Sequence, residues 1–128
     1  MNTLLARRRT GRVLLDTRPI YEGPPHPALP LEHKKPRRPV NPVLTAPFTL
    51  IRFISHPQKE ANRPFLEAWV NPLSRWLRHG TQVYFFIHCP DDVYTPENAR
   101  FLQAFFEERG VPVPPLPWSG IGAQLRLL

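Results

Sequence analysis

Three runs of hydrophobic residues along the chain each end in a polar or ionisable cluster. They are VLLDTRP at 13–19, TLIRFISH at 49–56 and VYFFIHCPDD at 83–92. Apolar strands that finish in Asp, Arg and His are typical of a parallel α/β sheet, in which polar side chains gather at the carboxyl ends of the strands. The pattern therefore predicts a parallel sheet whose strand ends form a ligand-facing rim.

The second and third runs give the clearest strands. Within residues 48–54, alternation puts Arg52 on one face of the strand and Ile51 and Phe53 on the other. An arginine in the middle of a strand needs a partner. Residues 82–88 are rich in strand formers and apolar on both faces, so we expect them to form a central, buried strand.

The first main helix is predicted by apolar residues that recur at three- and four-residue spacing from Phe65 to Leu77. Gly80 is expected to close it. Pro72 interrupts the pattern, so we expect the regular helix to start near Asn71, with the proline at its first position.

The second helix is predicted to start at Thr95, whose hydroxyl is a suitable cap, with Pro96 at the first position and Glu97 favoured by the helix dipole. Gly110 ends it. Its inner stripe consists of Ala99, Leu102, Phe105 and Phe106.

Proline dominates the rest of the chain. Nine of the 18 prolines lie in residues 19–47, where regular structure is not expected and a long Pro-rich connection is predicted. Residues 111–128 are expected to form an extended tail laid over the domain, with Trp118 as an anchor. Residues 2–9 could form one or two helical turns.

Length and cysteine content bound the class of protein. With 128 residues the chain has room for about one domain. Cys89 is the only cysteine, which excludes an intramolecular disulfide and favours a reducing, cytoplasmic location. No stretch has the length of a membrane span, and the first ten residues lack the apolar core of a secretory signal.

Positive charge is concentrated in the leading segment. The net charge is +7, of which residues 1–38 carry +6 because nine Lys or Arg face three acidic residues. The basic clusters are Arg7–Arg9 with Arg12, and Lys34–Lys35 with Arg37–Arg38. They could contact nucleic-acid phosphates, but no aromatic residues interleave with them as stacking platforms. A solvated loop surface is the alternative.

Four consecutive blocks carry a family resemblance. They are GRVLLDTRPIYE, KKPRRPVNPVLTAPFTLIRFISH, NRPFLEAWVNPLSRWLRHGTQVYFFIHCPDD and TPENARFLQAFFEERGVPVPPLPW. These blocks, which span residues 11 to 118, resemble the carboxyl-terminal part of the YecE-like family, catalogued as domain of unknown function 72. Members of that family are (β/α) barrels. The resemblance therefore implies that the chain forms the last strands and helices of a TIM-type barrel.

Size agrees with a partial barrel, because a complete eight-stranded barrel takes about 250 residues and only three convincing strands are present. We therefore expect residues 1–128 to be a single incomplete domain. Three parallel strands leave an unpaired apolar edge that invites pairing with another chain. The expected partners are a polypeptide that supplies the other half of the barrel, or further copies of this chain.

Ionisable residues at the strand ends of such a barrel converge on one mouth. Histidine can act as acid or base near neutral pH, and a guanidinium can clamp a carboxylate or phosphate with two hydrogen bonds. The candidate catalytic residues are His88 and Asp16, and the candidate ligand-binding residues are Arg18, Arg52, His56 and Asp91.

Each candidate also has a purely structural interpretation. Asp16 could pair with Arg18 in a local turn, or with Arg52 in the interior. The histidines could simply bond to backbone groups, and Asp91 with Asp92 could shape a turn.

Arginines at the rim favour an anionic organic ligand over a cation, and no metal-binding motif is present, so no metal site is predicted. No cofactor is indicated. Cys89 follows His88 directly, which sends the two side chains to opposite faces and makes a buried thiol the simplest interpretation.

Two functional classes stay open at this point. The first is an enzyme-like barrel that binds a small anion at its mouth, such as a hydrolase or lyase. The second is a nucleic-acid or protein interaction module that uses the basic leading segment. A fragment without activity is a third outcome, and a membrane partner is not expected.

Overall fold

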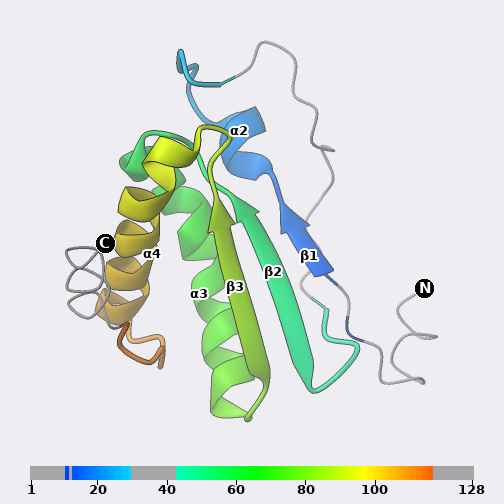
Figure 1. The fold of residues 1–128 in the computed structure, drawn as a ribbon. Coiled ribbons are helices and arrows are strands. Elements are labelled where there is room, and N and C mark those ends of the chain that lie inside the picture. Colours follow the sequence, from blue (N-terminus) through cyan, green and yellow to red (C-terminus); the bar gives the residue numbers. More distant parts are fainter. Residues whose placement is uncertain (1–10, 12, 30–42, 117–128) are drawn as a thin grey trace, which may run out of the picture.

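A three-stranded parallel sheet forms the centre of the molecule (Figure 1). The structure is a computed structural model that describes residues 11, 13–29 and 43–116. β1 (Val13–Asp16), β2 (Phe48–Ile54) and β3 (Gln82–His88) pair in the order β1-β2-β3, and all run in the same direction. The predicted parallel α/β class is confirmed. In the described part of the chain the sheet is open at both edges, and a closed barrel is not observed.

The helices are α2 (Arg18–Glu22), α3 (Arg63–Arg78) and α4 (Thr95–Glu108), with 3₁₀ turns η1 (Lys59–Asn62) and η2 (Asp92–Tyr94) before the two long ones. α3 and α4 lie on the same side of the sheet (Figure 1). Each strand is followed by a helix, which is the expected connection between parallel neighbours because the chain must return to the opposite end of the sheet.

The core lies between the sheet and the two long helices. Ile51 and Phe53 of β2 are fully buried against Leu66 and Trp69 of α3 and against Phe106 of α4. Aromatic rings fill most of this layer. Phe85 packs centrally, with ring centroids 5.9 Å from Phe53, 6.1 Å from Trp69 and 5.7 Å from Phe106. The edge-on or tilted arrangement of these rings is the one that aromatic pairs prefer.

The opposite face of the sheet carries apolar side chains without cover from the described residues. Val13, Phe48, Tyr84 and Phe86 are 54%, 43%, 44% and 54% exposed. We call this surface, together with Arg52 and His88, the open face. β3 is an edge strand with one side uncovered, so the prediction of a central, buried strand at 82–88 is wrong. Its apolar pattern fits burial on both sides, but the described chain provides neighbours on only one.

α3 corrects the predicted start of the first helix. It runs without interruption from Arg63 to Arg78 and contains Pro72 in its interior, and Pro64 lies in its first turn. The proline removes the amide that would donate to the carbonyl of Ala68, and Ala68 is exposed, so water can satisfy that oxygen. Burial of the apolar face of the helix outweighs the local penalty.

Each long helix ends two residues before a glycine, at the positions that the sequence predicts. Gly80 and Gly110 have φ of 81° and 75°, the left-handed conformation that glycine adopts without penalty. The predicted capping role of Thr95 is wrong. Its hydroxyl accepts a hydrogen bond from the amide of Cys89 at 3.1 Å, and no side chain caps α4.

α2 corrects the expectation that residues 19–47 lack regular structure. Pro19 lies in the first turn of this five-residue helix, where the absent amide costs no bond. The predictions for the basic clusters, for a helix at 2–9 and for an anchoring Trp118 concern residues 1–10, 12, 30–42 and 117–128, which lie outside the described residues.

Candidate functional site

The carboxyl ends of the three strands meet at one end of the sheet, below α2 in Figure 1. The predicted gathering of strand ends is therefore present, but the candidate residues face opposite sides of the sheet. Asp16 is in register with buried Phe53 and faces the helices. Arg52 is exposed, and His88 is in register with Ile54, two positions after Arg52, so both belong to the open face.

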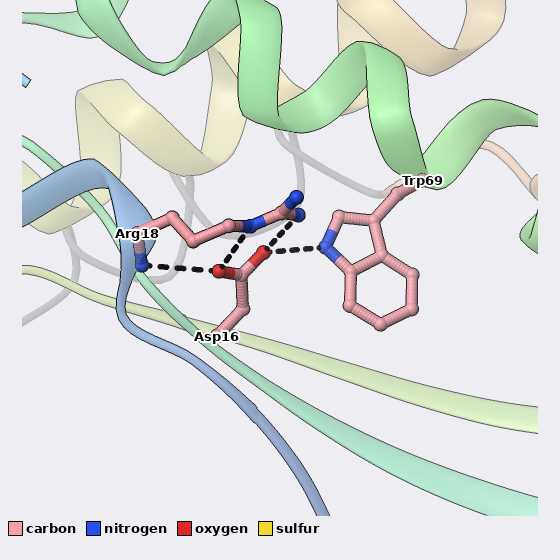
Figure 2. A network of polar contacts seen from close by, with 3 residues as sticks. All are labelled: Asp16, Arg18 and Trp69. Atoms are coloured by element: carbon pink, nitrogen blue, oxygen red, sulfur yellow. Dashed lines mark hydrogen bonds and ion pairs between the residues drawn. The ribbon is translucent and has the colours of Figure 1, made fainter. Parts of the chain in front are cut away.

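Asp16 is the centre of a polar network on the helix side (Figure 2). Its Oδ1 accepts from the backbone amide of Arg18 at 3.1 Å and from Arg18 Nε at 2.9 Å. Its Oδ2 accepts from Arg18 Nη2 and from Trp69 Nε1, both at 2.8 Å. Four donors occupy the acceptor sites of a carboxylate that is fully buried. The structure therefore contains the local Asp16–Arg18 ion pair, and a pair between Asp16 and Arg52 does not form.

Arg18 is held in place by this carboxylate. The hydrogen bond from its guanidinium to Asp16 raises the pKa of Arg18, against the opposing effect of partial burial. The guanidinium also lies 5.8 Å from the ring centroid of Phe65, within cation–π range. Arg18 thus clamps the end of β1 to the start of α2 and to α3.

His56 is fully buried, and both of its ring nitrogens are engaged. Nδ1 accepts from the backbone amide of Gln58 at 3.0 Å, and Nε2 contacts the carbonyl oxygen of Pro24. Because an amide can only donate and a carbonyl can only accept, this pairing fits the neutral tautomer with the proton on Nε2. His56 joins the loop after α2 to the loop after β2.

Gly23 lies beside His56, at a position that has no room for a side chain. An added Cβ would clash with the carbonyl oxygen of Pro19 and would lie 2.9 Å from Cδ2 of His56. The close approach of the α2 end to His56 therefore requires glycine at this position.

Arg52 and His88 are the accessible candidates on the open face. The structure gives the Arg52 side chain no hydrogen bond or ion pair with any residue that it describes. His88 is 40% exposed, and its Nδ1 lies 3.4 Å from Oδ1 of exposed Asp92. The two residues share the open face with Leu15 and Phe86, the register partners of Arg52 on either side.

Asp91 shapes the turn after β3. Its carboxylate accepts from the amide of Val93 at 3.2 Å and caps the 3₁₀ turn η2. This contact agrees with the structural interpretation of the Asp91–Asp92 pair. A ligand-binding role for Asp91 stays a prediction.

Sequence reasoning missed a buried amide network under the strand ends. Asn62 accepts from the amide of His56 at 2.7 Å and donates to its carbonyl at 3.0 Å. Asn98 donates to Ser55 Oγ at 3.0 Å and to the carbonyl of His56 at 2.9 Å. Ser55 in turn donates to the carbonyl of His88 at 3.3 Å. The position of each asparagine near the start of a long helix was the only available signal.

Cys89 lies next to this network as a fully buried thiol. Burial raises the pKa of Cys89, while hydrogen bonds from the backbone of Asp91 and from Ser55 act in the opposite direction. A thiol that retains its proton is a weak nucleophile, which agrees with the interpretation of Cys89 as a structural residue.

The described residues contain neither a metal-binding cluster nor a membrane-spanning helix. Within residues 11, 13–29 and 43–116, no three His, Cys, Asp or Glu side chains are grouped so that they could hold a metal ion. Over the same ranges, no helix combines the length and apolar character needed to cross a bilayer.

Comparison with known proteins places these features in a family. Residues 1–120 match the family described as "Protein of unknown function DUF72". The chain is 38% identical over 104 residues to the UPF0759 protein YecE of Escherichia coli K12, and 37% identical over 104 residues to YecE of E. coli O157:H7. Each match covers 80% of this chain and 38% of the relative, so the chain spans well under half the length of these curated proteins. No solved structure matches it. By the extent of these matches, the chain belongs to the DUF72 family.

Proposed function

We propose that this chain forms one part of a DUF72 (β/α) barrel and that its open face binds a small anionic ligand through Arg52 and His88. The proposal concerns the class of ligand and the residues that would hold it.

Three features support the barrel. The strands are all parallel, both long helices cover the same face, and the other face is apolar and exposed. In a closed barrel the uncovered face turns inward and is filled by side chains from other strands. The curated relatives are long enough to supply them, since the match covers 38% of their length. We therefore propose further parallel strands of the same family as the partner of the open face.

Arg52 is the observation that carries the anion proposal. It is a permanently charged group in the middle of β2, between Leu15 and Phe86, and it has no partner among the described residues. Covering such a face would bury the guanidinium, and an unpaired buried charge is strongly unfavourable. A bound carboxylate or phosphate would satisfy it with two hydrogen bonds.

His88 is proposed as the second contact because it lies on the same face and close to the strand end. An imidazole there can donate a hydrogen bond to an anion or exchange a proton with it. Asp16, Arg18 and His56 are less suited to the ligand, because their polar atoms are engaged within the protein.

Calorimetric titration with inorganic phosphate and with a small dicarboxylate tests the proposal. Wild-type protein is expected to bind at least one of them, and Arg52→Ala is expected to lose about tenfold or more in affinity, as for a charged hydrogen-bonded contact. Arg78→Ala is the matched control. It removes the same charge from an exposed position at the carboxyl end of α3.

The competing class, a nucleic-acid module, uses residues outside the described ranges and stays a prediction. Affinity for DNA or RNA that falls steeply with salt and is unchanged in Arg52→Ala would favour it. Equal phosphate affinity in Arg52→Ala and Arg78→Ala would contradict the proposed site.

A further inference from the structure

Two His-Pro turns lie against each other near the carboxyl end of β2. They are His26-Pro27-Ala28, in the loop after α2, and His56-Pro57-Gln58, which begins two residues after the strand. In each turn the amide two residues after the histidine donates to the ring Nδ1, at 3.0 Å in both cases. Because an amide can only donate, Nδ1 is an acceptor, and the matching neutral tautomer carries its proton on Nε2.

The Nε2–H groups of the two histidines have different surroundings. In His56, which is fully buried, this group contacts the carbonyl oxygen of Pro24. His26 is only half-buried, and its Nε2 has no hydrogen-bond partner among the residues that the structure describes. The same local turn therefore satisfies one donor inside the protein and leaves the other available for an outside partner.

The loop that carries His26 is fixed against the strand ends. The amide of Leu29 donates to the carbonyl of His26 at 2.9 Å, and Pro24 contacts His56. The ring of His26 also packs nearly perpendicular to two other rings, with centroids 5.8 Å from His56 and 5.7 Å from Tyr94. A side chain that is held by packing and hydrogen bonds loses little entropy when it binds a ligand.

Tyr94 connects His26 with the open face. It is the last residue of η2, whose first residue, Asp92, lies with Oδ1 3.4 Å from Nδ1 of His88. Tyr94 is half-buried, and its hydroxyl has no hydrogen-bond partner within the described part of the chain. His26 and Tyr94 thus bring two unused donors to the same rim of strand ends as His88.

We propose that His26 and Tyr94 form a rim contact of the ligand site, in which His26 Nε2–H and the Tyr94 hydroxyl donate to oxygen atoms of the bound anion. This inference rests on the proposed function for the class of ligand and extends the site from the open face to the rim. Arg52 supplies a permanent charge, and the rim supplies directional donors. A phosphate or carboxylate has several acceptor positions, so it can accept from more than one of these groups.

Calorimetric titration of the full chain with inorganic phosphate and with a small dicarboxylate tests the proposal through two replacements of His26. An Asn side chain can present an acceptor in place of Nδ1, and a Gln side chain can present a donor in place of Nε2–H. His26→Asn loses the outer donor and is expected to bind the anion about three- to tenfold more weakly, as for one hydrogen bond. His26→Gln should bind within about twofold of wild type.

Two further variants separate the hydroxyl from the rings and from general effects. Tyr94→Phe keeps the ring that packs on His26 and loses the hydroxyl, so its affinity should fall by about threefold. His79→Asn makes the same exchange at an exposed histidine that follows α3, and it should bind like wild type. Circular dichroism melts of all variants verify that they are folded.

The outcomes distinguish this inference from the proposed function. Weaker binding by Arg52→Ala with unchanged binding by His26→Asn would overturn the rim contact alone. The reverse result would contradict Arg52 as the anion site, while the rim contact would stand. Equal losses in His26→Asn and His26→Gln would show that the ring has a structural role only and would overturn the inference. A nitrogen NMR spectrum in which neutral His26 carries its proton on Nδ1 would do the same, and a wild-type chain that binds neither anion would overturn both proposals.

Discussion

Both faces of the sheet carry apolar side chains, but the surroundings of the two faces differ greatly. On the covered face, Phe85 packs against Phe53, Trp69 and Phe106, and Asp16, the one buried carboxylate among the described residues, is held by four donors. On the open face, apolar side chains are exposed and Arg52 has no partner among the described residues. The comparison separates residues that stabilise this chain from residues available for contacts with something else.

The largest expected effect is the loss of a core side chain on the covered face. Phe53→Ala removes a fully buried ring and should lower the free energy of unfolding by about 3–5 kcal/mol, from lost transfer energy and the cavity left behind. Urea unfolding followed by circular dichroism measures it. Phe86→Ala, the same change on the open face, should cost about 0.5 kcal/mol or less. Equal costs would remove the distinction between the faces.

The next effect concerns the network of Asp16. Asp16→Asn removes the charge that pairs with Arg18 and replaces one of two acceptor oxygens with a donor group. We expect a loss of about 1.5–3 kcal/mol, the range for hydrogen bonds to charged groups. Asp92→Asn, at an exposed carboxylate, is the control in the same unfolding experiment. A variant as stable as wild type would show that the network contributes little.

A third prediction concerns self-association through the open face. Among the described residues, the apolar sheet face is exposed and neither edge strand has an outer neighbour, so the isolated chain should associate with itself. Phe86→Glu is expected to lower the mass measured by sedimentation, whereas Val93→Glu, at a 74% exposed position in η2, should leave it unchanged. A wild-type protein that is monomeric at all concentrations would contradict this expectation.

The smallest effect is a pH dependence that comes from Cys89. Because burial raises its pKa, the folded protein keeps the thiol proton at a pH where the unfolded chain has begun to lose it. The protonated thiol therefore contributes fully to the free energy of unfolding below the ordinary thiol pKa of about 8.5. This contribution declines as the pH rises above that value. The difference in unfolding free energy between wild type and Cys89→Ala should shrink over that range. A constant difference would argue against the buried thiol.

Much of the fold could be predicted because local signals agreed with the tertiary structure. Continuous apolar runs identified three parallel strands, and Gly80 and Gly110 identified the helix ends. Pro72 misled the prediction, because a local penalty of a few kcal/mol is outweighed by burial of a whole helix face. The apolar pattern of β3 likewise cannot reveal whether a neighbouring strand is present.

The candidate site was predictable in position but not in detail. Parallel strands bring their ends together, so Asp16, His56 and His88 were correctly placed at one end of the sheet. Which face each side chain takes depends on register, and which atoms are occupied depends on distant partners. Trp69 bonds to Asp16 across 53 positions of sequence, and Pro24 to His56 across 32. No local pattern encodes such pairs.

Nuclear magnetic resonance during a titration with inorganic phosphate tests the central claim most directly, because it reports on both faces in one sample. The account predicts saturable shifts of the Arg52 Nε–H and His88 ring signals, with the Trp69 Nε1–H and Arg18 Nε–H signals unchanged. Shifts confined to Arg18 and Trp69, or no saturable shift at Arg52, would contradict it.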